Sequence, residues 1–254
     1  MAEEEIPKEE KNITPVEEVE KIKTIKENFK AKKERERKDV LASWVPKTQL
    51  GKRVKEGKEK DIDKILEKGK KILEAEIVDH ILNLESEFFM IGQAKGKFGG
   101  GKRRVWRQTQ KKTKEGNVIT FSTMVVVGDK KGHVGIGYGR AKETLPAREK
   151  AIRLAKLNIT RIERGFEDPA DSLKEDPHTV PFKLIGKCGS VEITLMPAPR
   201  GTGLCVADEC KKLLRLAGIK DVYSRTNGNT RTTFNLIKAC IDALQKTKQM
   251  KGIK

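Results

Sequence analysis

The segment from Val118 to Gly139 limits most strongly what this chain can fold into. Residues 118–127 read Val-Ile-Thr-Phe-Ser-Thr-Met-Val-Val-Val, a β-branched run that is typical of a strand, and Gly128-Asp129 then indicates a turn. Residues 133–139 read His-Val-Gly-Ile-Gly-Tyr-Gly, so a second strand is expected to carry glycine on one face. A helix should follow from about Leu145 to Asn158. This order of elements predicts a compact strand–strand–helix unit in an α+β fold.

The faces of that helix follow from its 3.6-residue period. We expect Leu145, Ile152, Ala155 and Ile159 to point inward. The outward-facing bases would be Arg148, Arg153 and Lys156.

The alternating glycines at 135, 137 and 139 do not fit a dinucleotide-binding loop. That fingerprint needs a third glycine three positions further on and a helix that begins at once, whereas residues 140–143 separate these glycines from the helix. A strand face without side chains lets another backbone or a ligand approach closely. The bases around it (Lys130, Lys131, His133, Arg140 and Lys142) indicate a phosphodiester backbone as that ligand.

A second structural unit follows a linker rich in Pro, Asp, Ser and Glu at residues 167–176. A strand from Thr179 is expected to turn at Gly186, and a second strand covers 190–196. The remaining elements are expected in this order: a loop at 197–203, a helix from Val206 to Ala217 closed by Gly218, a short strand at 221–225, a turn at 227–229 and a helix over 232–246.

The loop Pro197-Ala-Pro-Arg-Gly-Thr-Gly203 allows three interpretations. Backbone N–H groups at a helix start bind anions, and Arg200 would help them. The anion could be RNA phosphate or the triphosphate of a nucleotide in a small-molecule kinase, although the Gly-Lys-Ser/Thr of a Walker loop is missing. Carboxylates that could hold magnesium are limited to Asp208 and Glu209. The third possibility is a turn that only joins a strand to a helix.

Residues 95–114 contain nine bases and no acid, half of the net charge of +18 that arises from 55 Lys plus Arg and 37 Asp plus Glu. Such a charge repels itself unless a polyanion neutralises it, and nucleic acid is the usual partner. Glycines keep this stretch flexible, while Phe98 and Trp106 offer flat faces beside arginines. Guanidinium groups pair with phosphates, and aromatic rings stack on unpaired bases. We therefore expect RNA contact here.

The N-terminal part divides into a charged arm and a more ordered segment. Residues 1–40 hold 12 acids and 11 bases without a lasting period, which indicates a solvated arm. Residues 44–51 form a short apolar anchor. Apolar residues at helical spacing over 62–73 predict an amphipathic helix, covered either by the body of this protein or by a partner.

The remaining residues give no sign of a metal, a cofactor or catalysis. Cys188, Cys205, Cys210 and Cys240 form no C-x-x-C pair and sit beside apolar residues, so buried thiols are expected. The three histidines are far apart and lack a nearby nucleophile motif. The acidic start lacks the order of a signal peptide, and no apolar run approaches the roughly 18 residues of a membrane helix. A cytoplasmic binder of polyanions, without a membrane partner, is the expected class.

The chain resembles the small-subunit ribosomal protein five family, in its archaeal and eukaryotic branch. The matching segments stand in family order over residues 44–247: Trp44-Val-Pro-Lys-Thr-Gln-Leu-Gly, Gln108-Thr-Gln-Lys-Lys-Thr, Phe121-Ser-Thr-Met-Val-Val-Val-Gly-Asp, His133-Val-Gly-Ile-Gly-Tyr-Gly, Lys156-Leu-Asn-Ile, Pro177-His-Thr-Val-Pro-Phe-Lys, Gly186-Lys-Cys-Gly-Ser-Val, Pro197-Ala-Pro-Arg-Gly-Thr-Gly and Lys211-Lys-Leu-Leu-Arg-Leu-Ala-Gly-Ile.

The resemblance implies a double-stranded-RNA-binding-like domain, then an α/β domain shared with elongation factors and small-molecule kinases. Family members bind small-subunit ribosomal RNA near the decoding region and the side where messenger RNA enters, beside the small-subunit proteins four and eight. They support accurate tRNA selection and are associated with unwinding of structured messenger. The hairpin at Thr113–Phe121 corresponds to the loop near the family's spectinomycin site. The first 80 residues resemble the branch-specific extension.

Four regions are expected in consequence: an N-terminal extension with an amphipathic helix (1–80), the double-stranded-RNA-binding-like domain (81–165), a linker (166–178) and the C-terminal domain (179–254). We expect a structural constituent of the small ribosomal subunit, not an enzyme, without cofactor or metal. The expected RNA-binding residues are Lys102, Arg103, Arg104, Arg107, Lys111, Lys112, Lys114, Lys130, Lys131, His133, Arg140, Lys142, Arg148, Arg200, Gly201, Thr202, Arg225 and Arg231.

Overall fold

The computed structural model describes residues 41–94, 96, 103–167 and 176–250. The chain divides into two compact units, residues 1–45 and 46–254, and only 41–45 of the first are described. The predicted arm at 1–40, the predicted RNA contact Lys102, Phe98 and residues 168–175 of the predicted linker lie outside the described residues.

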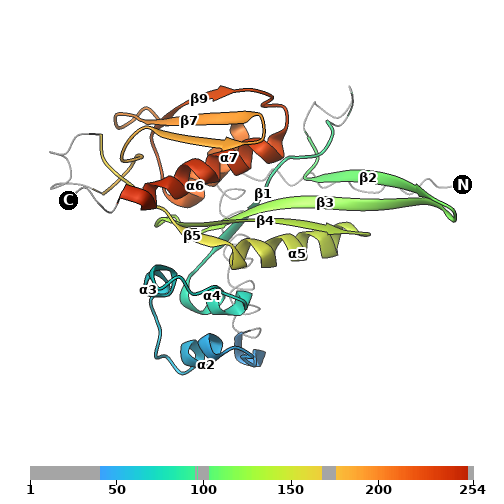
Figure 1. The fold of residues 1–254 in the computed structure, drawn as a ribbon, viewed down its shortest axis with the longest axis horizontal. Helices are drawn as coiled ribbons and strands as arrows, with labels where there is room; N and C mark the ends of the chain where they lie inside the picture. Colours follow the sequence, from blue (N-terminus) through green and yellow to red (C-terminus); the bar gives the residue numbers. More distant parts are fainter. Residues whose placement is uncertain (1–40, 95, 97–102, 168–175, 251–254) are drawn as a thin grey trace, which may run out of the picture. The chain divides into compact units, whose positions relative to one another are not determined.

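An antiparallel sheet occupies the first half of the unit 46–254 (Figure 1). Its order is β1-β3-β4-β5, and β2 pairs with the first half of β3. β-Branched residues make β3 the long central strand, and the predicted hairpin between β3 and β4 is confirmed. The strands are β1 (Glu85–Phe88), β2 (Trp106–Thr113), β3 (Gly116–Gly128), β4 (His133–Ala141) and β5 (Ile159–Arg161).

Helix α5 (Thr144–Leu157) packs on the glycine face of β4. Ala147, Ala151 and Ala155 repeat every fourth residue and are fully buried. A Cβ atom on Gly137 would lie 2.0 Å from the carbonyl oxygen of Ala151. The expectation that this strand face is open to a ligand is therefore wrong, because the missing side chains make room for the helix. The inward position expected for Leu145 is also wrong: the alanine stripe faces the sheet, and Leu145 is 62% exposed.

The second sheet has the order β6-β7-β9-β8, in which β8 runs parallel to β9 and the other pairs are antiparallel. The turn expected at Gly186 is wrong, because Gly186 lies inside β6, where a Cβ would meet the carbonyl oxygen of Ala239 at 2.0 Å. The chain turns at 189–190 instead. The elements are β6 (Leu184–Cys188), β7 (Val191–Pro197), β8 (Leu204–Cys205), α6 (Asp208–Ala217), β9 (Val222–Asn227), α7 (Thr233–Gln245) and η3 (Lys246–Met250).

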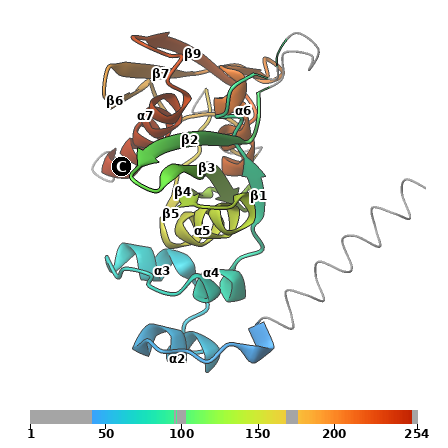
Figure 2. The same ribbon diagram turned by 90° about the vertical axis from the view of Figure 1, so that its right-hand side faces the viewer.

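Helices α6 and α7 lie between the two sheets, so both sheets share one core (Figure 2). Leu213 and Leu216 of α6 belong to the same buried cluster as Met124 and Val126 of β3. Gly218 closes α6 in the left-handed conformation with φ +82°, as predicted. The two predicted domains are thus packed through a common apolar layer rather than joined only by a linker.

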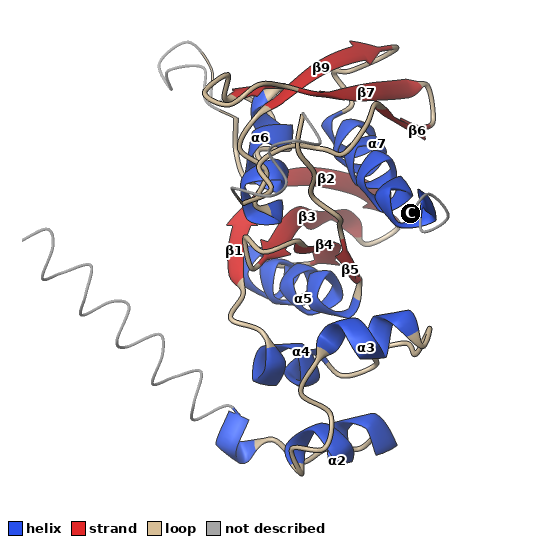
Figure 3. Cartoon of the chain, turned by 90° about the vertical axis from the view of Figure 1, so that its left-hand side faces the viewer, coloured by secondary structure: helices blue, strands red, loops and turns tan. Residues whose placement is uncertain are grey.

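Residues 46–81 form three short helices, α2 (Gln49–Lys55), α3 (Ile62–Glu67) and α4 (Ala75–Ile81), and α3 and α4 lie next to α5 (Figure 3). The single amphipathic helix expected over 62–73 is wrong, because Gly69 adopts φ +66° after α3 and Leu73 is exposed. Ile65 is buried, and α3 packs against β5. The body of this protein therefore covers the segment.

Within the described residues, no helix combines the length and apolar character needed to cross a membrane.

Candidate nucleic-acid interface

The β2–β3 hairpin carries four of the predicted basic residues, Arg107, Lys111, Lys112 and Lys114, and extends past the ends of β4 and α5 (Figure 1). The glycines at 99–101, expected to keep the stretch 95–114 flexible, lie outside the described residues. Flexibility is wrong for the second half of this stretch, because Trp106–Thr113 pairs residue by residue with Gly116–Thr123. Pairing with a β-branched partner strand imposes the extended conformation. The hairpin therefore holds its basic side chains at fixed spacings.

The register sorts these side chains onto two faces. Arg107 and Arg140 pair with the same residue of β3, from opposite sides. Cross-strand partners and residues four apart on a strand project to the same face. Arg107 and Lys111 of the hairpin and Arg140 of the neighbouring strand β4 therefore share one face of the sheet, and all three are exposed.

Hydroxyl groups lie between these bases. Arg140 donates from Nη2 and Nε to Oγ1 of Thr120, at 2.9 and 3.2 Å, and Oγ1 of Thr109 lies 2.8 Å from the same atom. Arg107 and Lys111 stand about 13 Å apart along β2 at about 3.3 Å per residue. The paired positions on this face carry no acidic residue. Such a surface can neutralise phosphates in a row.

The other predicted bases near the hairpin are exposed but differently placed. Lys112 lies on the opposite face, Lys114 stands in the turn, and Arg103 and Arg104 precede β2. Lys142 is exposed just after β4.

The helix pattern predicted that Arg148 points into solvent, and this prediction is wrong. Its guanidinium carbon lies 5.6 Å from the ring centroid of Phe88 and 5.4 Å from that of Trp106. The side chain is half-buried, because α5 directs it toward the end of β1 at Phe88 and the start of β2 at Trp106. Its charge is therefore used in cation–π contacts that fix the base of the hairpin.

His133 also has internal partners. Its Nδ1 lies 2.6 Å from Oδ2 of Asp129, and its Nε2 lies 2.9 Å from Oδ1 of Asp63 in α3. Burial by itself lowers the pKa of His133, but the hydrogen bonds to the two carboxylates outweigh it and raise the pKa above its ordinary value. This histidine joins the helical segment to the sheet.

The loop at Pro197–Gly203 does not open a helix, because β8 separates it from α6. Two of its backbone N–H groups have internal acceptors: Thr202 donates to the carbonyl of Pro199 at 3.3 Å, and Gly203 donates to the carboxylate of Asp221 at 2.8 Å. The N–H of Gly203 is therefore not free to bind a phosphate, because the carboxylate of Asp221 accepts from it. The third interpretation, a connecting turn, fits Gly201 and Thr202 best, while Arg200 is exposed beside it.

The remaining predicted bases are spread over the molecule. Arg225 is exposed on β9 and Arg231 just before α7, whereas Lys130 and Lys131 form the β3–β4 turn. Four bases that sequence reasoning missed surround that turn, namely Arg164, Lys211, Arg215 and Lys220. They come from segments far apart in the chain, so no local pattern could have shown them together.

The cysteines follow the prediction only in part. Cys210 and Cys240 are fully buried, but Cys205 is exposed at the edge strand β8, so its expected burial is wrong. In the part of the chain that the structure describes, no group of three or more His, Cys, Asp or Glu residues is placed to hold a metal ion.

Sequence comparison identifies the class of protein. Residues 105–163 match the family described as Ribosomal protein S5, N-terminal domain, and residues 186–254 match Ribosomal protein S5, C-terminal domain. The two matches follow each other as the two sheets do. Together with the basic hairpin they define a ribosomal protein with an α+β fold, as the sequence predicted.

Relatives among archaea identify the family. The chain is 48% identical over 207 residues to small ribosomal subunit protein uS5 of Nanoarchaeum equitans, covering 81% of this chain and 88% of the relative. It is 45% identical over 211 residues to uS5 of Hyperthermus butylicus (82% and 92% covered) and 42% identical over 213 residues to uS5 of Methanothermobacter thermautotrophicus (84% and 91%). The chain therefore belongs to the uS5 family of small ribosomal subunit proteins, in its archaeal branch. Members of this family are structural parts of the ribosome.

Proposed function

We propose that this protein binds small-subunit ribosomal RNA through one face of the β2–β3 hairpin, near the decoding region and the side where messenger RNA enters. The observation that carries the proposal is the placement of Arg107, Lys111 and Arg140 on one acid-free face. Arginine and lysine at fixed spacing neutralise consecutive phosphates, and the hydroxyls between them can donate to phosphate oxygens. The contact is positional: it holds RNA elements in one geometry.

The proposal includes assembly and accuracy. A rigid hairpin on a body with a shared core would keep the surrounding RNA in the arrangement that correct tRNA selection needs. Proteins of the small-subunit four and eight families are the proposed neighbours, and messenger RNA is the second proposed nucleic acid. The site of action would be the cytoplasmic ribosome. His133 and Arg148 are left out of the RNA contact because their charges have partners within the protein.

The proposed domain boundaries stay as predicted, at 1–80, 81–165, 166–178 and 179–254. An isolated bridge between Gly165 and Thr179 supports a linker whose two ends lie together.

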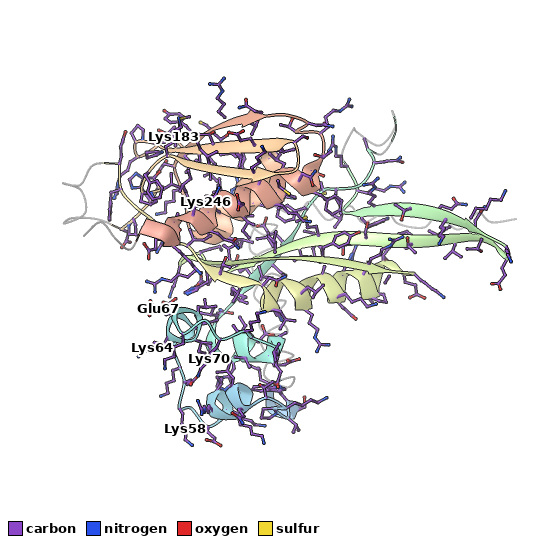
Figure 4. All side chains as sticks on the ribbon, viewed as in Figure 1. Lys58, Lys64, Glu67, Lys70, Lys183 and Lys246 are labelled. Atoms are coloured by element: carbon purple, nitrogen blue, oxygen red, sulfur yellow. The ribbon has the colours of Figure 1, made fainter. Side chains whose placement is uncertain are left out.

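Equilibrium binding to purified small-subunit ribosomal RNA over a salt series tests the RNA contact. We expect Arg107→Gln/Lys111→Gln/Arg140→Gln to flatten the slope of log affinity against log salt by about 2, since each lost phosphate contact removes about 0.7–0.9. The matched control is Lys183→Gln/Lys187→Gln/Lys238→Gln, which removes the same charge from exposed positions of the C-terminal domain. Lys183 lies well away from the hairpin (Figure 4). An equal slope in both triple variants would contradict the proposal.

The finer claims have their own readouts. Sedimentation of the native protein with the small subunit, maintained at high salt, is expected of an integral constituent. Subunits carrying the hairpin variant should show increased misreading in a reporter translation assay, while the control triple should not.

A further inference from the structure

A shallow cavity of about 970 Å³, open to solvent, lies where the β3–β4 turn meets the C-terminal end of α6. Its lining holds six cationic side chains and a single carboxylate, that of Asp176. The bases are Lys130, Lys131, Arg164, Lys211, Arg215 and Lys220. Both sheets contribute to this site, through the β3–β4 turn on one side and Leu204 of β8 on the other.

Among the described residues, most of this charge has no acidic partner. Lys130 pairs with Glu85 at 2.7 Å, both exposed, and the half-buried Lys211 pairs with the exposed Asp208 at 2.9 Å. Lys131, Arg164, Arg215 and Lys220 have no ion pair within the described residues. These four cations lie around one shallow cavity, and their summed positive potential raises the local concentration of anions there.

The backbone fixes the arrangement of these cations. The N–H of Lys130 donates to the carbonyl of Leu216 at 2.9 Å, and Lys130 itself adopts φ +62°, which is unusual for a residue other than glycine. A Cβ at Gly218 would lie 2.1 Å from the carbonyl oxygen of Lys130. The turn and the end of α6 are therefore locked against each other, and the cavity is part of the packed structure.

We propose that this cavity is a second phosphate-binding site for RNA, which engages both sheets at once; the inference rests on the proposed RNA-binding function. The described residues of the lining are Lys, Arg, Asp, Pro, Leu, Gly and Ile; among them there is no aromatic ring to stack on a base and no amide or hydroxyl side chain to read its edge. These residues could bind the phosphates of a nucleotide but not its base. The site therefore fits a nucleic-acid backbone, which positions without reading sequence.

The test uses the full chain and two triple variants with equal loss of charge. The cavity variant is Arg164→Gln/Arg215→Gln/Lys220→Gln, and the control is Lys183→Gln/Lys187→Gln/Lys238→Gln. Lys187 lies on β6, at the opposite edge of the second sheet from Leu204 of the cavity. With purified small-subunit ribosomal RNA in about 0.1 M salt, the cavity variant should bind about 100-fold more weakly, since three phosphate contacts each contribute about 0.7–0.9 of a log unit there. The control should change less than about threefold.

A charge-preserving variant separates binding from folding. Arg164→Lys/Arg215→Lys/Lys220→Arg should keep affinity within about fivefold and melt like the native protein, because phosphate binding here needs charge more than fork geometry. A loss equal to that of the glutamine variant would overturn the charge-based assignment. Equal losses in the cavity variant and the lysine control would overturn it as well. If the hairpin variant weakens binding and the cavity variant does not, this inference fails while the proposed function stands.

Two further arms distinguish other anions. A rise of the melting temperature with ATP or inorganic triphosphate that the cavity variant abolishes would assign the site to a free polyphosphate and overturn the RNA assignment. In intact small subunits, Lys220 should resist acetylation and become reactive after ribonuclease treatment. Protection that survives ribonuclease would assign the cavity to an acidic protein segment instead.

Discussion

Nε2 of His133 lies 2.9 Å from Oδ1 of Asp63, so the start of β4 is tied directly to helix α3. The other ring nitrogen meets Oδ2 of Asp129 at 2.6 Å. A carboxylate accepts but does not donate, so both hydrogen bonds are complete only when the ring is an imidazolium. The charge of His133, which the sequence analysis assigned to RNA binding, therefore attaches the segment 46–81 to the sheet.

We expect His133→Gln to lower the free energy of unfolding by about 2 kcal/mol at pH 6, because hydrogen bonds to charged groups contribute about 1.5–3 kcal/mol. The pKa of His133 is raised in the folded state. Its contribution is therefore complete below the unfolded pKa of about 6.5 and is lost as the pH rises through the higher folded value. Urea denaturation from pH 5 to 9 measures this.

The pKa of Asp129 moves the other way. Burial raises it, but the hydrogen bonds from His133 and from backbone N–H groups outweigh burial and lower the pKa. The contribution of Asp129 is fully present above its unfolded pKa and disappears as the pH falls through its lowered folded pKa. The pair is therefore most stabilising at pH values above the unfolded pKa of Asp129 and below the unfolded pKa of His133. The exposed His80→Gln is the matched control. A difference between native protein and His133→Gln that grows from pH 6 to 9 would contradict the assignment.

Gly137→Ala should destabilise the first sheet by about 3 kcal/mol, near the upper end for overpacking. The new methyl would meet the Ala151 carbonyl at 2.0 Å and the Ala155 nitrogen at 2.3 Å, and both are backbone atoms that move only if α5 moves. Chemical denaturation measures the loss. Gly96→Ala, where nothing lies within 4 Å, is the control and should be nearly neutral. Equal effects of the two substitutions would mean that α5 does not rest on β4 as described.

These glycines show how far sequence could predict the fold. The β-branched run in β3 and the glycine that ends α6 act locally, so their elements could be predicted. Gly186 and Gly137 act through a helix that arrives from elsewhere in the chain, and a glycine that admits a helix looks the same in sequence as one that turns the chain. Strand β2 could not be predicted because its polar residues, such as Arg107 and Lys111, carry no apolar period.

The pair Arg148 and Trp106 should show a coupling free energy of about 1 kcal/mol in a double-mutant cycle with Arg148→Gln and Trp106→Leu. The guanidinium lies 5.4 Å from the indole centroid, and its burial reduces solvent screening. Arg153→Gln, an exposed base on the same helix, should show no coupling to Trp106. Hydrogen exchange should also accelerate at the start of β2 in Arg148→Gln. A coupling free energy near zero would contradict the cation–π contact, and Arg148 would again be a candidate for RNA binding.

The same pair shows why the candidate site could be predicted only in part. Composition and the acid-free run indicated RNA contact, since charge is a sum that needs no structure. Which basic side chain points outward depends on strand register and on neighbours from other elements. Arg107 faces solvent because of its pairing with β3, whereas Arg148 contacts the ring of Trp106, three elements earlier in the chain. Arg215 and Lys220 join Lys131 only in the folded chain.

Three of the four thiols should react in an order set by burial. Cys205 is exposed and should react with a thiol reagent in the native protein, whereas Cys210 and Cys240 should react only after unfolding. The hydrogen bond with Cys210, together with burial, raises the pKa of Cys240 well above its ordinary value, and the thiol form is a poor nucleophile. Mass spectrometry after timed alkylation identifies each site, and Cys205→Ser should remove the fast phase. If Cys240 in the native protein were labelled as fast as Cys205, α7 would not pack between the two sheets. The two sheets would then not share the core that fixes the hairpin and the cavity relative to each other.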